Sequence, residues 1–221
     1  MSRDIRITPS ILNADHSRIH EEIVSIASVS DYVHLDIMDG VFVPATTWNF
    51  EDAAQIISKS PIPVDAHLMV SNVDEIAPRY AEAGAASVTF HVEASQDIVK
   101  TAQSIRRMGS QAAIAVKPDT AIDEYLSQLN EIDMFLIMTV EPGKGGQPFM
   151  EAMLSKISQL RAAISDRPIW LQVDGGISLS TIERAAEAGA DTFVAGSAVF
   201  KADNRIEMIQ SLRNLAESAS L

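Results

Sequence analysis

Residues 169–196 read IWLQVDGGISLSTIERAAEAGADTFVAG, and this stretch contains one complete unit of the predicted fold. The run Ile169–Asp174 predicts a buried strand, the apolar spacing over Ser180–Ala188 predicts a helix, and Thr192–Ala195 predicts the next strand. Gly189 falls just after the helix, where glycine adopts a positive φ at little cost. A strand, a helix and a second strand in this order are typical of a parallel βαβ unit.

The same alternation continues along the chain, and the fragment YAEAGAASVTF from Tyr80 again joins a helix end, a glycine and a strand. Eight strands are predicted, at Ile5–Thr8, Tyr32–Asp36, Val64–Leu68, Ser87–His91, Ala112–Val116, Met134–Met138, Ile169–Asp174 and Thr192–Ala195. Eight helices are predicted, at Asp15–Ser28, Phe50–Ser58, Asp74–Ala83, Gln96–Met108, Asp123–Leu129, Glu151–Ile164, Ser180–Ala188 and Arg205–Ser218. The sequence therefore predicts an α/β protein, a single-domain (β/α)8 TIM barrel over residues 1–221.

The composition excludes several classes of protein. A formal net charge of −13, without clustered Lys and Arg, argues against a nucleic-acid partner, because phosphate backbones require such clusters. No stretch approaches the ~18 apolar residues of a membrane span, and the first residues do not resemble a secretory signal, so we expect a cytoplasmic protein without a membrane partner. The absence of cysteine excludes disulfides and thiol catalysis. A small phosphorylated ligand stays compatible, since backbone N–H groups bind anions whatever the net charge.

Four ionisable side chains fall at the carboxyl ends of predicted strands, where such barrels hold their reactive groups. His34 and Asp36 alternate along one strand and so point to the same side. His67 ends the third strand, and Asp174 ends the seventh. A lone histidine at a strand end is usually a hydrogen-bonded interior residue, but four such groups at three strand ends indicate a metal site. Two imidazoles and two carboxylates suit Zn²⁺, Fe²⁺, Mn²⁺ or Co²⁺ better than Mg²⁺ or Ca²⁺.

Other side chains near these strand ends have two possible roles. Asp65 is expected to support the site, and His91 beside Glu93 is either hydrogen-bonded inside the barrel mouth or purely structural. Methionines suit the wall of a pocket because they are polarizable and adaptable, although ordinary core positions explain them equally well. The candidate pocket-lining methionines are Met38, Met69 and Met138.

Glycines gather in three predicted loops that follow adjacent strands. The sixth strand is followed by EPGKGGQ over residues 141–147, and the next two loops contain further glycines. Any one of these loops is compatible with a tight turn, but three together predict a phosphate site, because glycines let backbone N–H groups approach an anion. Segment 143–147 is expected to close over the phosphate. The candidate residues are Gly143, Lys144, Gly145, Gly146, Gly175, Gly176, Gly196 and Ser197.

Seven ordered motifs resemble those of the ribulose-phosphate 3-epimerases. They are PSILNAD from Pro9, VHLDIMDGVFVP from Val33, DAHLMV from Asp65, HVEAS from His91, MTVEPGKGGQPF from Met138, VDGGI from Val173 and VAGSAVF from Val194. The resemblance implies one divalent metal ion bound by His34, Asp36, His67 and Asp174, with Asp36 and Asp174 as the acid/base pair. It also implies sugar contacts from Ser10 and His67 and phosphate contacts from Gly145, Gly146, Gly176, Gly196 and Ser197.

The implied reaction interconverts D-ribulose 5-phosphate and D-xylulose 5-phosphate, as in the pentose phosphate pathway. Inverting a carbon beside a ketone needs one carboxyl group to remove a proton and a second to return it on the opposite face. A shared cation stabilises the enediolate formed between the two steps. Members of this family commonly form dimers or hexamers, so the resemblance also implies a homo-oligomer.

The sequence departs from the family pattern in two places. After Val43-Pro44 it has Ala45–Asn49 in place of the usual residues, and Lys144 stands where phenylalanine is common. Lys144 either reaches the substrate phosphate or points to solvent. The altered segment leaves open an epimerase for another ketose phosphate, such as D-allulose 6-phosphate. A decarboxylase of sugar-acid phosphates is disfavoured by His34, and a non-catalytic sugar-phosphate binder is disfavoured by the retained aspartates and histidines.

Overall fold

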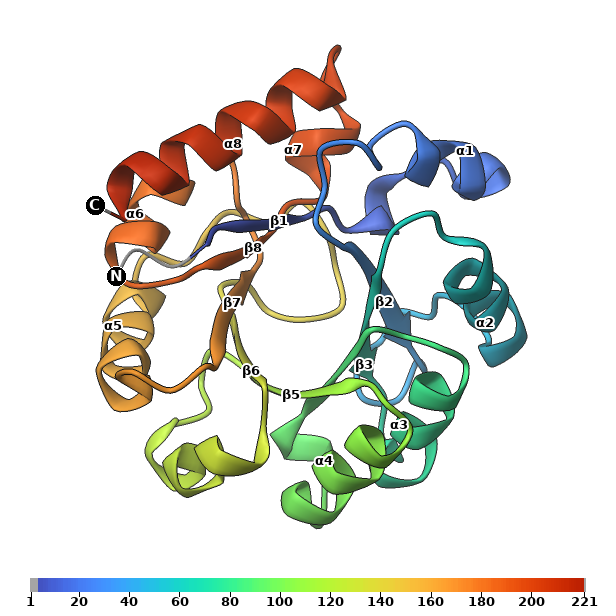
Figure 1. Ribbon diagram of the computed structural model, residues 1–221, viewed down its shortest axis with the longest axis vertical. Coiled ribbons are helices and arrows are strands. Elements are labelled where there is room, and N and C mark those ends of the chain that lie inside the picture. The colour runs from blue at the N-terminus through green and yellow to red at the C-terminus, as the bar shows by residue number, and fades with distance from the viewer. Residues whose placement is uncertain (1–3, 221) are drawn as a thin grey trace.

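The computed structural model describes residues 4–220, and its strands form a ring surrounded by helices (Figure 1). The strands are β1 Arg6–Thr8, β2 Val33–Met38, β3 Val64–Met69, β4 Ser87–His91, β5 Gln111–Val116, β6 Met134–Met138, β7 Trp170–Asp174 and β8 Thr192–Val194. All pairings are parallel, in the order β1-β8-β7-β6-β5-β4-β3-β2. The ring closes where the His34 N–H donates to the Pro9 carbonyl at 3.0 Å. The predicted TIM barrel is confirmed, while its predicted limits at residues 1 and 221 lie outside the described residues.

Helices cover the outside of the ring (Figure 1). The α-helices are α1 Ile19–Val24, α2 Phe50–Lys59, α3 Val73–Glu82, α4 Ile98–Arg107, α5 Met153–Ile164, α6 Ile182–Glu187, α7 Ser197–Phe200 and α8 Arg205–Ala219. The 3₁₀ helices are η1 Ile11–Asn13, η2 His16–Arg18, η3 Val92–Ala94 and η4 Asp123–Glu131. Among the described residues, no helix is both long and apolar enough to cross a bilayer.

Two helix predictions were partly wrong. The helix predicted over Asp15–Ser28 is divided into η2 and α1, because Asp15 accepts hydrogen bonds from the N–H and the hydroxyl of Ser17 and Arg18 has a non-helical φ of −133°. Such a local side-chain bond favours a tight turn over a regular helix. The segment predicted as a helix over Asp123–Leu129 is the 3₁₀ helix η4, in which the Tyr125 N–H donates at 2.9 Å to the carbonyl of Ile122, three residues earlier.

The pleat of the strands separates the apolar core from the polar interior of the barrel. In β2, Val33, Leu35 and Ile37 belong to the main hydrophobic core, while His34 and Asp36 alternate with them. A shift of pairing by one residue would exchange these two faces, so the apolar set strongly specifies the register. The observed register of β2 and β3 pairs His34 with Asp65 and Asp36 with His67. Folding of the core therefore brings the polar residues of two strands together.

Candidate active site

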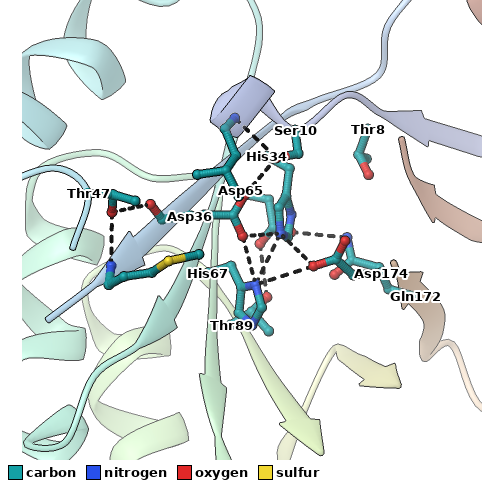
Figure 2. Close-up of polar contacts among 12 residues, drawn as sticks. Thr8, Ser10, His34, Asp36, Thr47, Asp65, His67, Thr89, Gln172 and Asp174 are labelled. Carbon is teal, nitrogen blue, oxygen red and sulfur yellow. Dashed lines mark hydrogen bonds and ion pairs between the residues drawn. The ribbon is translucent and has the colours of Figure 1, made fainter. Parts of the chain in front are cut away.

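Four side chains from β2, β3 and β7 point toward one another inside the barrel (Figure 2). His34 Nε2 lies 3.2 Å from His67 Nδ1. Asp36 Oδ1 lies 3.2 Å from His67 Nδ1 and 3.5 Å from His34 Nε2. Asp174 Oδ2 lies 3.7 Å from His67 Nδ1 and 3.8 Å from His34 Nε2. One donor atom from each residue thus surrounds a common point, and all four atoms lie within 4.8 Å of one another.

Asp65 orients the ring of His34 from behind this cluster. Its Oδ2 lies 2.9 Å from His34 Nδ1, while hydroxyl groups of Ser87 and Thr89 donate to its Oδ1 and the Gln172 amide donates to its Oδ2. An ionised carboxylate only accepts hydrogen bonds, so His34 Nδ1 carries the proton in this contact. In the neutral imidazole, the form that binds a metal, the lone pair of Nε2 then faces Asp36 and Asp174.

The two aspartates of the cluster have opposite pKa shifts. Burial alone would raise the pKa of Asp36, but the charges and hydrogen bonds of His34 and His67 hold it well below its usual range. Burial raises the pKa of Asp174 to about 6. The histidines lower this pKa, and repulsion from Asp36 offsets part of their effect. Burial lowers the pKa of His34, yet the adjacent carboxylates of Asp36 and Asp65 raise it well above 6.5. The residues alone therefore provide one ionised carboxylate and one that takes up a proton near pH 6.

Hydroxyl groups fix Asp36 at both its side chain and its backbone. Ser10, just before η1, donates to Asp36 Oδ2 at 2.6 Å. Thr47 donates to the Asp36 carbonyl at 2.7 Å and accepts the Met38 N–H at 2.9 Å. Segment Ala45–Asn49, which differs from the family pattern, is therefore hydrogen-bonded through Thr47 to the end of β2, beside a candidate catalytic residue.

A cavity lies above the cluster and is bounded by Asp36 and Asp174. His34 and His67 lie beneath it and are 0% exposed. Met38, Met69 and Met138 contribute to its wall, from β2, β3 and β6. The other predicted contact residues on its lining are Ser10, Gly143, Lys144, Gly145, Gly146, Gly175, Gly176, Gly196 and Ser197. The structure thus brings every predicted site residue to the cavity or to the donor cluster below it.

Close backbone packing explains the glycines of the cavity. Gly176 has a φ of +68°, and a Cβ there would lie 2.7 Å from the Cα of Phe149. Gly143 has a φ of +102°, and its Cβ would lie 2.8 Å from the Cβ of Val43. Larger residues at these positions would displace the loop after β6 from the barrel mouth. The exposed backbone left by the glycines is suited to binding an oxyanion.

Residues 6–200 match the model of the ribulose-phosphate 3-epimerase family. The chain belongs to this family. Its relatives include a protein of Mycobacterium tuberculosis strain H37Rv named ribulose-phosphate 3-epimerase, which is 46% identical over 217 residues, or 97% of this chain and 94% of the relative. Ribulose-phosphate 3-epimerase 1 of Cupriavidus necator is 44% identical over 207 residues, or 90% of this chain and 86% of the relative. The predicted family and the expectation of an isomerase are confirmed.

Solved structures support the barrel fold of this epimerase-family chain. The 3-keto-L-gulonate-6-phosphate decarboxylase of Vibrio cholerae superposes with a TM-score of 0.71, and the match covers 98% of this chain and 99% of the decarboxylase. Its sequence is 16% identical, so this likeness concerns the fold alone.

Two features of the epimerase-family site, and the individual contacts of Gln147, were not predicted from the sequence. Helix α7 begins at Ser197, directly after the cavity residue Gly196. The side-chain amide of Asn13 lies between two loops. A Cβ on Gly145 would lie 2.8 Å from Asn13 Oδ1, and a Cβ on Gly196 would lie 3.0 Å from the same atom. Gln147 also lines the cavity, and its side-chain amide donates to the Lys144 carbonyl at 2.8 Å. The sequence could have indicated a role for Asn13 only through the PSILNAD motif, in which it stands three residues after Ser10.

Proposed function

We propose that the chain is a metal-dependent ribulose-phosphate 3-epimerase that interconverts D-ribulose 5-phosphate and D-xylulose 5-phosphate. The observation that carries this proposal is the pair of carboxylates from β2 and β7, which bound one cavity above a four-donor cluster. Membership of the epimerase family and the names of the relatives support the same reaction. Proton transfer by two carboxyl groups is the minimal equipment for inverting a carbon beside a ketone.

The donor set fits a divalent cation. Ligands arranged tetrahedrally at about 2.0–2.2 Å from an ion are separated from one another by about 3.3–3.6 Å. Five of the six separations among the four donor atoms run from 3.2 to 3.8 Å, and all six lie within 4.8 Å. His34, Asp36, His67 and Asp174 would hold the ion, which we propose to be Zn²⁺, Fe²⁺, Mn²⁺ or Co²⁺. When bound, it supplies Lewis-acid stabilisation of the negative charge that develops on the substrate oxygens as the proton leaves.

Asp36 and Asp174 are the proposed acid/base pair. They lie on strands that are not neighbours in the sheet, so they approach the cavity from different sides. In the metal-free cluster the pKa shifts of the two carboxylates are opposed, so the two groups differ in proton affinity, as the acid and the base of such a reaction must. Ser10, which donates to Asp36 Oδ2, holds that carboxylate in place and lies at the cavity for contact with the sugar.

The glycine loops are proposed to bind the phosphate. Gly145, Gly146, Gly176, Gly196 and Ser197 line one cavity although they come from three loops. Backbone N–H groups in such loops bind oxyanions without a positively charged side chain, which agrees with the acidic composition of the chain. Gly143, Lys144 and Gly175 are further candidates on the same lining.

The altered segment after β2 supports no change of substrate. Residues Ala45–Asn49 are absent from the described residues that line the cavity, so their side chains form no part of its wall. A five-carbon ketose phosphate therefore stays the favoured substrate over D-allulose 6-phosphate. A homodimer or hexamer, a cytoplasmic location and the absence of a nucleic-acid partner stay predictions.

A coupled assay on D-ribulose 5-phosphate tests this proposal. We expect formation of D-xylulose 5-phosphate that is lost after chelation and restored by Zn²⁺, Mn²⁺, Fe²⁺ or Co²⁺. Parallel assays on D-allulose 6-phosphate compare the two substrates. Faster turnover of the six-carbon sugar would contradict the proposed specificity, and binding of sugar phosphates without turnover under any metal would favour a non-catalytic binder.

A further inference from the structure

His91 and Glu93 continue the polar network behind His67, away from the cavity. His91 ends β4 and is 0% exposed, and its Nε2 lies 3.0 Å from Nε2 of His67. Its other nitrogen, Nδ1, lies 3.1 Å from Glu93 Oε2. The opposite nitrogen of His67, Nδ1, faces Asp36 and Asp174. A continuous path therefore leads from a carboxylate outside the cluster to one of its four donor atoms.

We propose that Glu93 and His91 are positioning residues that fix the proton of His67 on Nε2 and thereby leave Nδ1 free to bind the cation. This inference rests on the metal site of the proposed function. It concerns residues that touch neither the cavity nor the cation. The proposal assigns a donor and an acceptor to each contact from Glu93 through His91 to His67, whereas a histidine with only a packing role would need no such assignment.

The direction of the path follows from the partners of Glu93. Glu93 Oε1 accepts the Lys117 N–H at 2.7 Å and also accepts the Thr120 hydroxyl group. Since a carboxylate has no proton to give, His91 Nδ1 must donate to Oε2. A neutral imidazole carries one proton, so His91 Nε2 is an acceptor and His67 Nε2 must be the donor. The lone pair of His67 Nδ1 then faces the donor cluster.

The surroundings of His91 hold this order in place. The ring of Phe42 packs 4.8 Å from that of His91, and Lys117 Nζ lies 3.9 Å from the centre of the Phe42 ring. The loop that binds Glu93 is itself fixed, because Lys156 Nζ on α5 donates to carbonyl groups of Lys117, Pro118 and Thr120. Each oxygen of the Glu93 carboxylate therefore has its own partners: Lys117 and Thr120 donate to Oε1, and His91 donates to Oε2.

The two histidines of the cluster are thus oriented by different routes. Asp65 contacts His34 directly and leaves Nε2 as its donor atom. Glu93 acts on His67 through a second imidazole and leaves Nδ1 as its donor atom. Partners of this kind typically change metal affinity by about 10- to 100-fold when they are replaced.

Glu93→Gln tests the proposed order by reversing it. The carbonyl of glutamine would replace Oε1 as the acceptor for Lys117 and Thr120, which leaves its NH₂ group to face His91 Nδ1. His91 would then donate from Nε2 and move the His67 proton to Nδ1, where it competes with the cation. We expect Zn²⁺ affinity, measured by competition with a chromophoric chelator, to fall about 10- to 100-fold. Glu187→Gln, on the exposed surface of α6, is the matched control and should keep the wild-type affinity.

Long-range ¹H–¹⁵N spectra of the Zn²⁺-loaded wild-type protein give a second test that needs no variant. The proton of His91 is expected on Nδ1 and that of His67 on Nε2. A proton on His91 Nε2, or a Glu93→Gln protein that binds Zn²⁺ as tightly as wild type, would overturn the inference while leaving the metal site intact. A wild-type protein that binds no divalent cation would instead refute the metal site of the proposed function, and the inference with it.

Discussion

The donor cluster and the glycine loops form two parts of one site, but they are built from different chemical groups. The cluster consists of ionisable side chains on strands, and hydroxyl, carboxylate and imidazole groups orient them. The proposed phosphate region consists of the loops after β6, β7 and β8, whose glycines present the backbone, and its Lys144 and Gly146 are exposed. The proposed acid/base groups are thus held by hydrogen bonds, whereas the proposed phosphate site depends on close loop packing. Substitutions in the two parts should therefore affect kcat and KM differently.

Replacing either aspartate should have the largest effect. Asp36→Asn and Asp174→Asn each remove an acid/base group together with a proposed metal ligand, so we expect kcat to fall about 10³-fold or more. Steady-state kinetics should be combined with elemental analysis of the metal content. Near-normal turnover by either variant with metal bound would refute the two-aspartate mechanism.

Gly176→Ala tests the phosphate region. The added Cβ would lie 2.7 Å from the Cα of Phe149 at a φ of +68°, so the loops after β6 and β7 must separate. We expect KM for the sugar phosphate to rise about 10-fold, with a smaller change in kcat, because weaker ground-state binding raises KM.

Gly109→Ala is the matched control for this loop. Gly109 also has a positive φ, +93°, but a Cβ there meets no atom within 4 Å. The control shares the backbone strain of Gly176→Ala but should keep the wild-type KM. Equal KM values for the two variants would show that loop packing at Gly176 does not govern phosphate binding.

The sequence predicted the strands and the donor cluster better than it predicted the helices and the supporting contacts. Apolar runs with alternating polar residues located β2 and β3 to within one or two residues at their ends. The same alternation predicted that His34 and Asp36 share a side. Apolar spacing alone does not separate an α-helix from the 3₁₀ helix η4, since both have similar periods.

The missed contacts join residues that are distant in sequence. Asn13 packs against Gly145 and Gly196, and Glu93 accepts hydrogen bonds from Lys117 and Thr120. The residues of each contact are far apart in the sequence and meet only in the folded barrel, so the sequence pattern around either residue does not predict the contact.

The pH dependence of stability tests how strongly the hydrogen bonds of Glu93 stabilise the folded protein. Burial would raise the pKa of Glu93, but hydrogen bonds from His91, Lys117 and Thr120 lower it from 4.5 to about 2. A folded-state pKa below the unfolded one gives stability that is present above about pH 4.5 and is lost as pH falls toward 2.

Between about pH 6 and pH 3.5, the metal-free wild-type protein should therefore lose about 1 kcal/mol more unfolding free energy than Glu93→Gln does. Urea denaturation at both pH values measures this difference. Glu187→Gln should follow the wild type, since its side chain is exposed on α6. Equal losses in wild type and Glu93→Gln would mean that the carboxylate is not preferentially stabilised in the folded state.

Lys144→Phe should have the smallest effect and decides whether the phosphate region uses a side-chain charge at all. Lys144 lines the cavity but is exposed, and an exposed charge contributes about 0–1 kcal/mol. If it contacts the phosphate, KM should rise about 2- to 5-fold, kcat should stay nearly constant, and the salt dependence of KM should weaken. Lys59→Phe, at the exposed end of α2, controls for the change in net charge. The same salt dependence in wild type and Lys144→Phe would mean that the Lys144 charge does not contribute to phosphate binding, which would sharpen the contrast with the ionisable donor cluster.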